Sequence, residues 1–448
     1  MSELKTIAKQ AATVLVGQLA VMAYSVTDTI VAGRYSSTSL AALSVGAAIY
    51  ISVFVALLGV TQAMLPIWAE LHGAQRHAAI GQSFRQTLYL CAITCLVGMA
   101  ILLHPEAIFR WTEVPELLRQ EAQDYLAVLA WSLPPALLFR MYSTLNQSLG
   151  RPLLVTWLQI GSLVLKVPLS IWFAFGGLGL APRGAVGCAM ASLVVGYALL
   201  AVALWMLRTQ PMYRPLRVWQ RMEAPVWRQI GGYARLGVPS ALAVTVEVTS
   251  FTLMALFIAR QGAAAAASHQ IAMNLAALLY MAPLAISIAA SARVSFWLGA
   301  GDLARARQAI GLGLRTVLAS ALVLSALLLL TRQFVVPIYS ANPQIAALAV
   351  PMLAWVALYH VFDGLQSISL FLLRCFKVVL VPFLVYVLLL WGGGLGGGYL
   401  LAYHGLGAIA PMHGPQAFWI ASALALGAAA LSLLCLLRWV VADREKDV

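Results

Sequence analysis

The stretch LGVPSALAVTVEVTSFTLMALFIA, residues 236–259, contains a single ionisable side chain, Glu247, within an otherwise apolar run. About 20 apolar residues are enough to cross the hydrocarbon core of a bilayer as an α-helix. A carboxylate at the centre of such a helix costs about 2.5 to 3.5 kcal/mol on insertion scales, and intramembrane acids usually face a cavity, pair with a cation or carry protons. The stretch therefore predicts a spanning helix with a functional acid.

The remainder of the chain has the same character. Hydrophobic residues make up 62% of the 448 residues and charged residues 10%, the mean hydropathy is +0.89, and soluble domains are about 25% charged. The fold class we predict is an all-α integral membrane protein with twelve transmembrane helices. We place these helices at residues 12–33, 42–66, 84–104, 123–145, 154–175, 185–207, 236–259, 268–291, 312–332, 346–371, 381–402 and 417–439.

The positions of Lys and Arg predict the orientation, because these residues concentrate in short cytoplasmic loops. With the N terminus inside, most basic residues fall on the inner side, so we expect both termini to be cytoplasmic. The net charge of +13 is then mainly a topology signal with anionic lipid headgroups of the bilayer as its contact. We expect no nucleic-acid partner.

The longest segment between spans divides the chain near its middle. Arg208 to Gly232 carries three prolines among several arginines, and six predicted helices lie on either side of it. We therefore predict an N-lobe (residues 1–207), a cytoplasmic linker (208–235) and a C-lobe (236–448), related as parallel repeats by a pseudo-two-fold axis along the membrane normal. Weak similarity between the segments 73–85 and 299–315 supports a duplication.

Asp28, Glu247 and Asp363 are the acids that lie more than four residues from either end of a predicted span, and they do not follow the repeat. Only Arg140 and Lys166 lie that far inside the predicted spans as bases, so two bases face three acids. If Glu247 and Asp363 share a cavity, they can hold a proton or bind Na⁺ together with neutral oxygens. Pairing that merely fixes helix packing is the alternative.

Helical periodicity places other side chains beside these acids. Phe251 and Met254 follow Glu247 at i+4 and i+7, on one stripe of the helix. Gln366 shares a face with Asp363 at i+3. Aromatic, thioether and amide groups next to an acid suit a cavity better than a lipid-facing surface.

Several motifs together resemble the multidrug and toxic compound extrusion (MATE) family, in particular its bacterial NorM-type branch, over nearly the whole chain. The motifs are Asp28-Thr29-Ile30-Val31-Ala32-Gly33, Gly73-Ala74, Gly184-Ala185-Val186-Gly187-Cys188, Gly237-Val238-Pro239, Glu247-Val248-Thr249, His269-Gln270-Ile271-Ala272-Met273-Asn274, Arg293-Val294 and Phe362-Asp363-Gly364.

This resemblance implies two six-helix lobes in a V-shaped arrangement in the bacterial inner membrane. It implies a multidrug efflux antiporter, not an enzyme, that exports amphipathic, often cationic drugs in exchange for inward Na⁺ or H⁺. Apart from that coupling ion we expect no cofactor, and we expect a monomer. A lipid-linked precursor flippase of the same broad superfamily is the alternative, although a pyrophosphate would call for several cavity arginines.

The resemblance also implies residue roles. By position, Glu247, Asp363 and Tyr280 resemble the C-lobe cation and drug site, where Na⁺ is a possible ligand of the two acids, and Asp28 resembles the N-lobe acid. Tyr280 can offer a cation-π face. The side chains expected to line the substrate cavity are Phe251, Met254, Met281, Phe362, Gln366 and Asn274.

One departure from the family pattern affects the N-lobe. Where the family commonly has two asparagines near the proline of helix five, this chain has Lys166 and Ser170 around Pro168. An unpaired intramembrane ammonium is costly, so we expect Lys166 to form an ion pair with Asp28, with snorkelling to the inner surface as the alternative. We hypothesise that the N-lobe therefore cannot hold Na⁺ and that coupling falls mainly to the C-lobe acids.

A glycine-rich run in the eleventh predicted span invites another interpretation. Gly392 to Gly397 contains a formal GxGxxG, but no strand precedes it, so we expect helix packing or a flexible kink there and no nucleotide site. A channel or receptor would not need paired midspan acids. A membrane enzyme is disfavoured because the spans contain no metal or nucleophile cluster.

Overall fold

The structure is a computed structural model that describes residues 2–111, 115–177, 179–340, 342–405, 407 and 410–446. This part of the chain is almost entirely helical, and twelve of its helical segments are long and apolar enough to cross a membrane. The prediction of an all-α protein with twelve transmembrane helices is therefore confirmed. The segments are Glu3–Tyr35, Ser37–Gly73, His77–Leu103, Leu118–Ser148, Leu153–Phe175, Gly184–Thr209, Trp227–Ala259, Ala263–Gly299, Leu303–Tyr339, Pro343–Cys375, Leu380–Tyr403 and Gln416–Arg444.

Many of the helices extend beyond the apolar runs that predicted them. The tenth, α12, begins at Pro343 and ends at Cys375, where hydropathy predicted residues 346–371. Its start is fixed by a cap, because the Asn342 side chain accepts a hydrogen bond from the Gln344 N–H at 2.9 Å, and proline suits the first helical position. Hydropathy reports where the bilayer core lies, whereas caps decide where a helix begins.

The chain forms two compact units, which we describe separately. The N-terminal unit consists of residues Val16–Ala241, and the C-terminal unit combines Met1–Leu15 with Leu242–Val448. The helix α1 (Glu3–Tyr35) contributes to both units, as does α9 (Trp227–Ala259).

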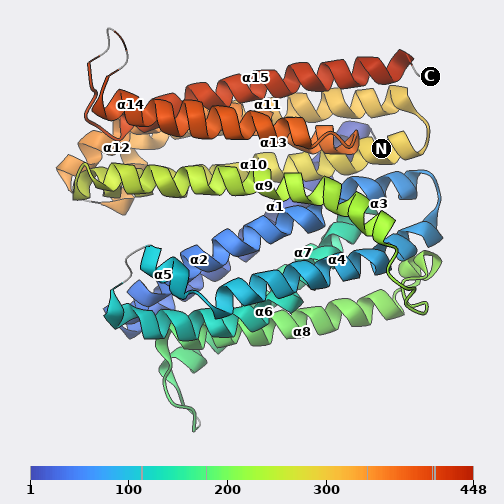
Figure 1. The fold of residues 1–448 in the computed structure, drawn as a ribbon, viewed down its shortest axis with the longest axis horizontal. Coiled ribbons are helices and arrows are strands. Elements are labelled where there is room, and N and C mark those ends of the chain that lie inside the picture. Colours follow the sequence, from blue (N-terminus) through green and yellow to red (C-terminus); the bar gives the residue numbers. More distant parts are fainter. Residues whose placement is uncertain are drawn as a thin grey trace. The chain divides into compact units, whose positions relative to one another are not determined.

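In the N-terminal unit, the central helix α6 contacts α2, α4 and α8, and α7 packs along α8 (Figure 1). Small residues allow close approach, as is usual between membrane helices: a Cβ at Gly59 of α2 would lie 2.4 Å from the Cα of Ala241 on α9. The elements of this unit besides parts of α1 and α9 are α2 (Ser37–Gln62), α3 (Met64–Gly73), α4 (His77–Leu103), α5 (Glu106–Trp111), α6 (Glu116–Ser148), α7 (Leu153–Phe175), α8 (Gly184–Thr209) and the short 3₁₀ helix η1 (Pro211–Leu216).

In the C-terminal unit, α12 is the central helix and contacts α10, α11 and α15. The start of α1 and the end of α15 lie at the same end of this unit's helices (Figure 1). Its further elements are α10 (Ala263–Gly299), α11 (Leu303–Tyr339), α13 (Leu380–Tyr386), the π-helical segment η2 (Val387–Gly396), α14 (Gly397–Tyr403) and α15 (Gln416–Lys446).

The first turns of α1 are attached to α10 within the C-terminal unit. Arg293 donates to both carboxylate oxygens of Glu3, at 2.6 and 3.0 Å, and the Trp297 indole N–H donates to the same carboxylate at 3.2 Å. Ile7 is fully buried in the hydrophobic core of this unit. A bidentate pair and a buried aliphatic side chain thus hold the start of the chain against residues almost 300 positions away.

The linker after α8 is held against α4 within the N-terminal unit. Arg85 donates to both carboxylate oxygens of Glu223, at 3.0 and 2.5 Å, and to the Arg217 carbonyl at 2.5 Å. The Gln86 side chain adds one bond to the Ala224 carbonyl and accepts another from the Val226 N–H. The hydrogen bond from Arg85 holds the pKa of Glu223 below its ordinary value.

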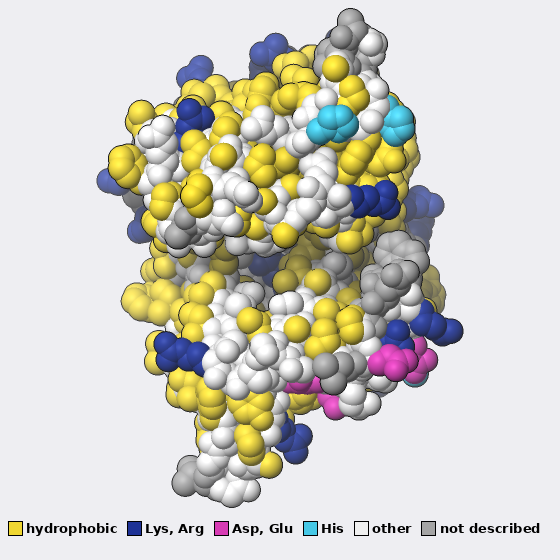
Figure 2. Space-filling model, turned by 90° about the vertical axis from the view of Figure 1, so that its left-hand side faces the viewer, with side chains coloured by type: hydrophobic (Ala, Val, Ile, Leu, Met, Phe, Trp, Pro, Cys, Tyr) yellow, Lys and Arg dark blue, Asp and Glu magenta, His cyan; other side chains and the backbone are white. Residues whose placement is uncertain are grey.

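The outer surface of α11 shows how these helices meet lipid. Val323, Leu327, Leu330, Phe334 and Ile338 recur at helical spacing, and each is more than half exposed. Such an apolar stripe would be costly in water but suits hydrocarbon chains. Hydrophobic side chains are also widespread on the face shown in Figure 2, where Lys and Arg side chains are scattered.

Candidate cation and substrate sites

The C-terminal unit contains a pocket between α9, α12, η2 and α15. It encloses roughly 360 Å³ of space, counting its open mouth. Glu247, Phe251 and Met254 all line it, as their shared helical stripe requires. Tyr359, Ser422 and further small or aliphatic side chains complete the wall. The pocket therefore combines one acid with an aromatic and thioether surface.

The second acid lies beside this pocket. Asp363 is 4% exposed and accepts a hydrogen bond from Gln366 Nε2 at 3.0 Å, one turn along α12. Its carboxylate and that of Glu247 are close enough to interact electrostatically. Glu247 and Asp363 thus belong to one charged group, although only Glu247 lines the pocket.

Three tyrosines lie near the two acids. Tyr280 on α10, Tyr359 on α12 and Tyr386 on α13 each interact electrostatically with both carboxylates. The Tyr386 side chain is completely buried, and its hydroxyl has no hydrogen-bond partner among the described residues. Sequence reasoning singled out Tyr280 but not Tyr386, because nothing in the sequence brings the start of the eleventh span next to the seventh.

A buried arginine also belongs to this cluster. Arg374 is 2% exposed and lies within the last turn of α12. It interacts electrostatically with Glu247, Tyr280 and Tyr386, and its guanidinium lies 4.7 Å from the ring centre of Phe371. The comparison of two bases with three acids therefore omitted Arg374, because the helix continues four residues past its predicted end at residue 371.

The glycine-rich run forms an unusual helix next to the pocket. Residues Val387–Gly396 form a π-helix, so the glycine-rich run is part of a helix with wider turns than an α-helix. Gly394 and Leu395 of this helix line the pocket. The Trp391 indole N–H donates to the Val246 carbonyl at 3.1 Å, on the residue before Glu247. π-Helical segments often occur at functional sites.

The remaining residues predicted to line the cavity are placed differently. Gln366 is buried and bonds Asp363, whereas Met281 and Phe362 are half-buried and Asn274 is exposed. None of these four is among the residues that line the pocket. The Asn274 side chain accepts a hydrogen bond from Gln270 Nε2 at 3.2 Å, and the Phe362 ring lies against Gly427.

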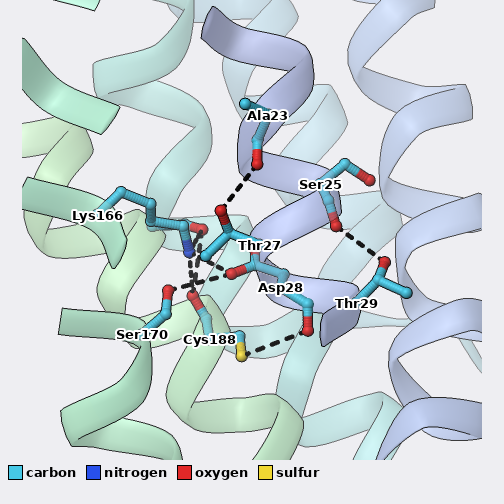
Figure 3. Close-up of polar contacts among 9 residues, drawn as sticks. Ala23, Ser25, Thr27, Asp28, Thr29, Lys166, Ser170 and Cys188 are labelled. Carbon is cyan, nitrogen blue, oxygen red and sulfur yellow. Dashed lines mark hydrogen bonds and ion pairs between the residues drawn. The ribbon is translucent and has the colours of Figure 1, made fainter. Parts of the chain in front are cut away.

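A polar cluster in the N-terminal unit is centred on Asp28 (Figure 3). Lys166 Nζ lies 2.7 Å from Asp28 Oδ1, and it also donates to the Cys188 carbonyl and the Ser192 hydroxyl, both at 2.8 Å. The Ser170 hydroxyl donates to Asp28 Oδ1 at 3.1 Å. All three ammonium protons therefore have acceptors.

The local helices explain this convergence. Lys166 and Ser170 are one turn apart on α7, and Cys188 and Ser192 are one turn apart on α8, so each pair presents one face toward Asp28 on α1. The Lys166 side chain is 0% exposed and that of Asp28 11%. The long lysine side chain thus ends inside the unit and does not snorkel to a surface.

The acids have no obvious partners for a multivalent metal. Among the described residues no three His, Cys, Asp or Glu side chains are grouped so that they could hold a metal ion. A monovalent cation at Glu247 and Asp363 would need neutral oxygens in addition to these carboxylates. Tyrosine hydroxyls, the Gln366 amide and backbone carbonyls of the cluster are the available donors of that kind.

Comparison with known proteins assigns the family. The MatE family profile matches residues 14–172 and 239–400. A probable multidrug resistance protein NorM from Aromatoleum aromaticum is 37% identical over 97% of this chain and 94% of its own length. A second NorM, from Chromobacterium violaceum, is 33% identical over 97% and 93%, and the multidrug resistance protein MdtK of Yersinia pseudotuberculosis is 30% identical over 98% and 96%.

Solved structures agree with this assignment at the level of the fold. The eukaryotic MATE transporter AtDTX14 has a TM-score of 0.87 at 18% identity and covers 100% of this chain and 99% of its own. The Vibrio cholerae MATE transporter VcmN in the bent form has a TM-score of 0.83 at 16% identity, with 99% and 98% covered. Since the profile and the relatives span both halves, the chain belongs to the MATE family, in its bacterial NorM-type branch.

Proposed function

We propose that the chain is a secondary active multidrug efflux antiporter of the bacterial inner membrane. It exports amphipathic, often cationic compounds in exchange for inward Na⁺ or H⁺ by alternating access. The relatives named as multidrug resistance proteins support this proposal. The observation that carries it is the pairing of Glu247 and Asp363 beside a pocket with aromatic and thioether walls.

Glu247 and Asp363 are the coupling groups in this proposal, and Tyr280 assists them. An organic cation in the pocket and an inorganic cation at the acids compete for the same negative charge. Cation binding from outside therefore releases the drug, and drug binding displaces the cation, as reciprocal linkage between the two ligands requires. Phe251 and Met254 supply apolar contact, while Met281, Phe362, Gln366 and Asn274 are candidates for the path beyond the pocket.

The N-terminal cluster has a different role in this proposal. Asp28 already has a permanent counter-ion in Lys166, and the ammonium has three acceptors. To bind at Asp28, Na⁺ would have to displace the buried ammonium group of Lys166. The Asp28–Lys166 pair is therefore structural, and the inward coupling ion does not use this site.

We also propose that the two lobes of the transporter are residues 1–207 and 236–448, joined by a cytoplasmic linker at 208–235. Both termini are cytoplasmic, as the distribution of Lys and Arg favours, and the protein acts as a monomer without a nucleic-acid partner.

The membrane potential is sufficient to drive this exchange. One elementary charge that crosses about 100 mV releases roughly 2.3 kcal/mol. At about 1.4 kcal/mol per tenfold concentration ratio, this energy sustains a ratio of a few tens between the drug concentrations on the two sides of the membrane. Membership of the MATE family does not favour the flippase alternative.

The test is transport by purified protein in liposomes. A fluorescent organic cation is loaded inside, and its efflux is followed under an imposed Na⁺ or H⁺ gradient for the parent, Glu247→Gln and Asp363→Asn. We expect gradient-driven efflux by the parent and a loss of at least tenfold in both variants, and the gradient that drives efflux identifies the ion. Efflux that survives in both variants would move the coupling role to Asp28, and parent protein without efflux would contradict the antiporter.

The structural role of the N-terminal pair needs its own comparison in the same assay. Lys166→Asn removes the ammonium and restores the residue type common in the family, whereas Asp28→Asn removes the acid. If the pair is one structural unit, both variants lose transport to a similar degree, in parallel with their folded amount. Unchanged transport by Lys166→Asn beside abolished transport by Asp28→Asn would show that Asp28 acts alone.

A further inference from the structure

The motif at residues 269–274 begins with a buried histidine to which the proposed function gives no role. We propose that His269 is a positioning residue of the pocket in the C-terminal unit, because it holds the indole of Trp419, and that the pocket therefore prefers planar aromatic cations to rounded aliphatic ones. This inference rests on the proposed function and adds to it the chemical class of the preferred substrate.

His269 on α10 and Trp419 on α15 are joined by a hydrogen bond. The Trp419 indole N–H donates to His269 Nδ1 at 3.2 Å. Trp419 is completely buried and His269 is 2% exposed, and a buried indole N–H needs an acceptor. Because Nδ1 accepts, the neutral imidazole carries its proton on Nε2, an atom without a hydrogen-bond partner among the described residues. The bond at Nδ1 is therefore what links this ring to another helix.

Trp419 contacts the aromatic part of the pocket wall without lining the pocket itself. Its ring centre lies 5.5 Å from that of Tyr359, edge to face at 82°, and 6.2 Å from that of Phe251. The Phe251 and Tyr359 rings are in turn 5.9 Å apart at 68°, and both line the pocket. Aromatic pairs at such distances attract each other in preferred orientations. The orientation of Trp419 therefore affects both rings that a ligand in the pocket meets.

The bond to His269 gives this group of rings a fixed direction. Ring contacts alone tolerate some rotation, whereas a hydrogen bond from the indole N–H weakens steeply when the donor turns away from its acceptor. Ser422, three residues after Trp419 on the same face of α15, lines the pocket. A rotation of the indole would therefore be transmitted to the wall and not to the outside of the unit.

A wall with fixed rings distinguishes ligands by shape. A planar aromatic cation gains from contacts with other rings only when their planes have the right orientation relative to its own. A tetraalkylammonium ion presents a similar surface in every direction, so its contact with an aromatic face depends less on ring rotation. Both ligands carry a single positive charge, so Glu247 attracts them alike. The ratio of their affinities thus reports ring orientation separately from charge.

Three variants separate the hydrogen bond from packing. His269→Leu removes the acceptor but keeps the branch at Cγ, whereas His269→Asn keeps an acceptor oxygen at the δ position. We expect His269→Leu to lower the ratio of N-methylacridinium to tetrapropylammonium affinity about fivefold, and His269→Asn to stay within about twofold of the parent. Ser268→Ala is the matched control, since this adjacent buried hydroxyl donates only within α10, to the Ala265 carbonyl at 2.8 Å.

The experiment measures equilibrium binding of both cations to purified full-length protein without an ion gradient, with the melting temperature as a check on folding. A reduced ratio in His269→Leu alone among the three variants supports the inference. An unchanged ratio in folded His269→Leu overturns it, as does a parent without preference for the planar cation. A merely structural bond would lower both affinities alike and leave the ratio unchanged. Since no gradient is present, failure of efflux in liposomes contradicts the antiporter and not this inference.

Trp419→Phe tests the same bond from the donor side and covers the case in which His269→Leu does not fold. It removes the indole N–H but keeps an aromatic ring, and we expect the affinity ratio to fall about fivefold here too. Where both single variants fold, their combination should lower the ratio no further, because each change alone already removes the bond. A parent-like ratio in Trp419→Phe, or losses that multiply in the double variant, would overturn the inference.

Discussion

Lys166 and Asp28 form a buried ion pair at 2.7 Å between α7 and α1. Three acceptors surround the ammonium and two donors reach one oxygen of the carboxylate. A buried pair of this kind adds little net stability relative to apolar residues, but the loss of one partner leaves an uncompensated charge. The pair therefore affects stability asymmetrically, and this asymmetry can be measured.

The double substitution of this pair should destabilise the protein less than either single substitution. Lys166→Met or Asp28→Asn alone should each lower the free energy of unfolding by about 3 to 5 kcal/mol, since one buried charge loses its partner. The combination of both substitutions should recover most of that loss. Apparent melting temperatures of the detergent-purified proteins report the effect, and additive losses in the double variant would contradict a coupled pair.

The contact between α2 and α9 gives a prediction about packing. A Cβ at position 59 would lie 2.4 Å from the Cα of Ala241, so Gly59→Ala requires the helices to separate. We expect a loss of about 1 to 3 kcal/mol, typical of an overpacked core. Gly161→Ala on α7 is the control, because no atom lies within 4 Å of its Cβ position. Equal melting temperatures of the two variants would contradict this tight contact.

The sequence was sufficient for the helices and for the acids. Twelve apolar runs of spanning length predict twelve helices because the bilayer leaves the backbone few alternatives. Glu247 and Asp363 stand out for a related reason, since charge is rare at membrane depth. Both signals are local properties of the chain, and therefore composition and spacing revealed them.

Arg374 and Tyr386 were missed because their importance depends on packing. The predicted helix ended at residue 371, three residues before Arg374, whereas the helix of the structure continues through Arg374 and its apolar neighbours Leu373 and Cys375. The apolar residues around it were a signal that could have identified a buried arginine. No comparable signal exists for the attachment of Glu3 to Arg293, because local sequence carries no information on a contact between distant segments.

The linker contact provides a test that depends on pH. Arg85 lowers the pKa of Glu223 below its ordinary value, so the folded state favours the ionised carboxylate. The stabilisation is present above the unfolded value of about 4.3 and is lost as the pH falls through the lower folded value. Because the Glu223 side chain is 39% exposed, solvent screening limits the contribution to less than about 1 kcal/mol.

Hydrogen exchange of the segment 217–226 measures this contact. In the parent, protection corrected for the intrinsic exchange rate should be constant around neutral pH and should decrease once the pH is below about 4. Glu223→Gln should show the reduced protection already at neutral pH. Parent and variant with the same protection at neutral pH would mean that the bonds of Gln86 suffice to hold the linker.

The π-helical segment leads to a prediction about substrate affinity. Gly394 lines the pocket, and a Cβ there would meet Ala425 and Ser422 at ordinary contact distances of 3.4 to 3.6 Å, so larger side chains extend into the pocket without a clash at their base. Gly394→Leu should therefore leave the melting temperature nearly unchanged and weaken binding of a bulky organic cation about tenfold, because the leucine occupies space that the ligand needs. The control is Gly392→Leu, at an exposed glycine of the same segment with no atom within 4 Å of its Cβ position. Gly392→Leu changes helix propensity in the same way as Gly394→Leu but adds no volume to the pocket. Equal losses of affinity in both variants would therefore assign the effect to the conformation of the helix, and they would contradict a role of the pocket in drug binding.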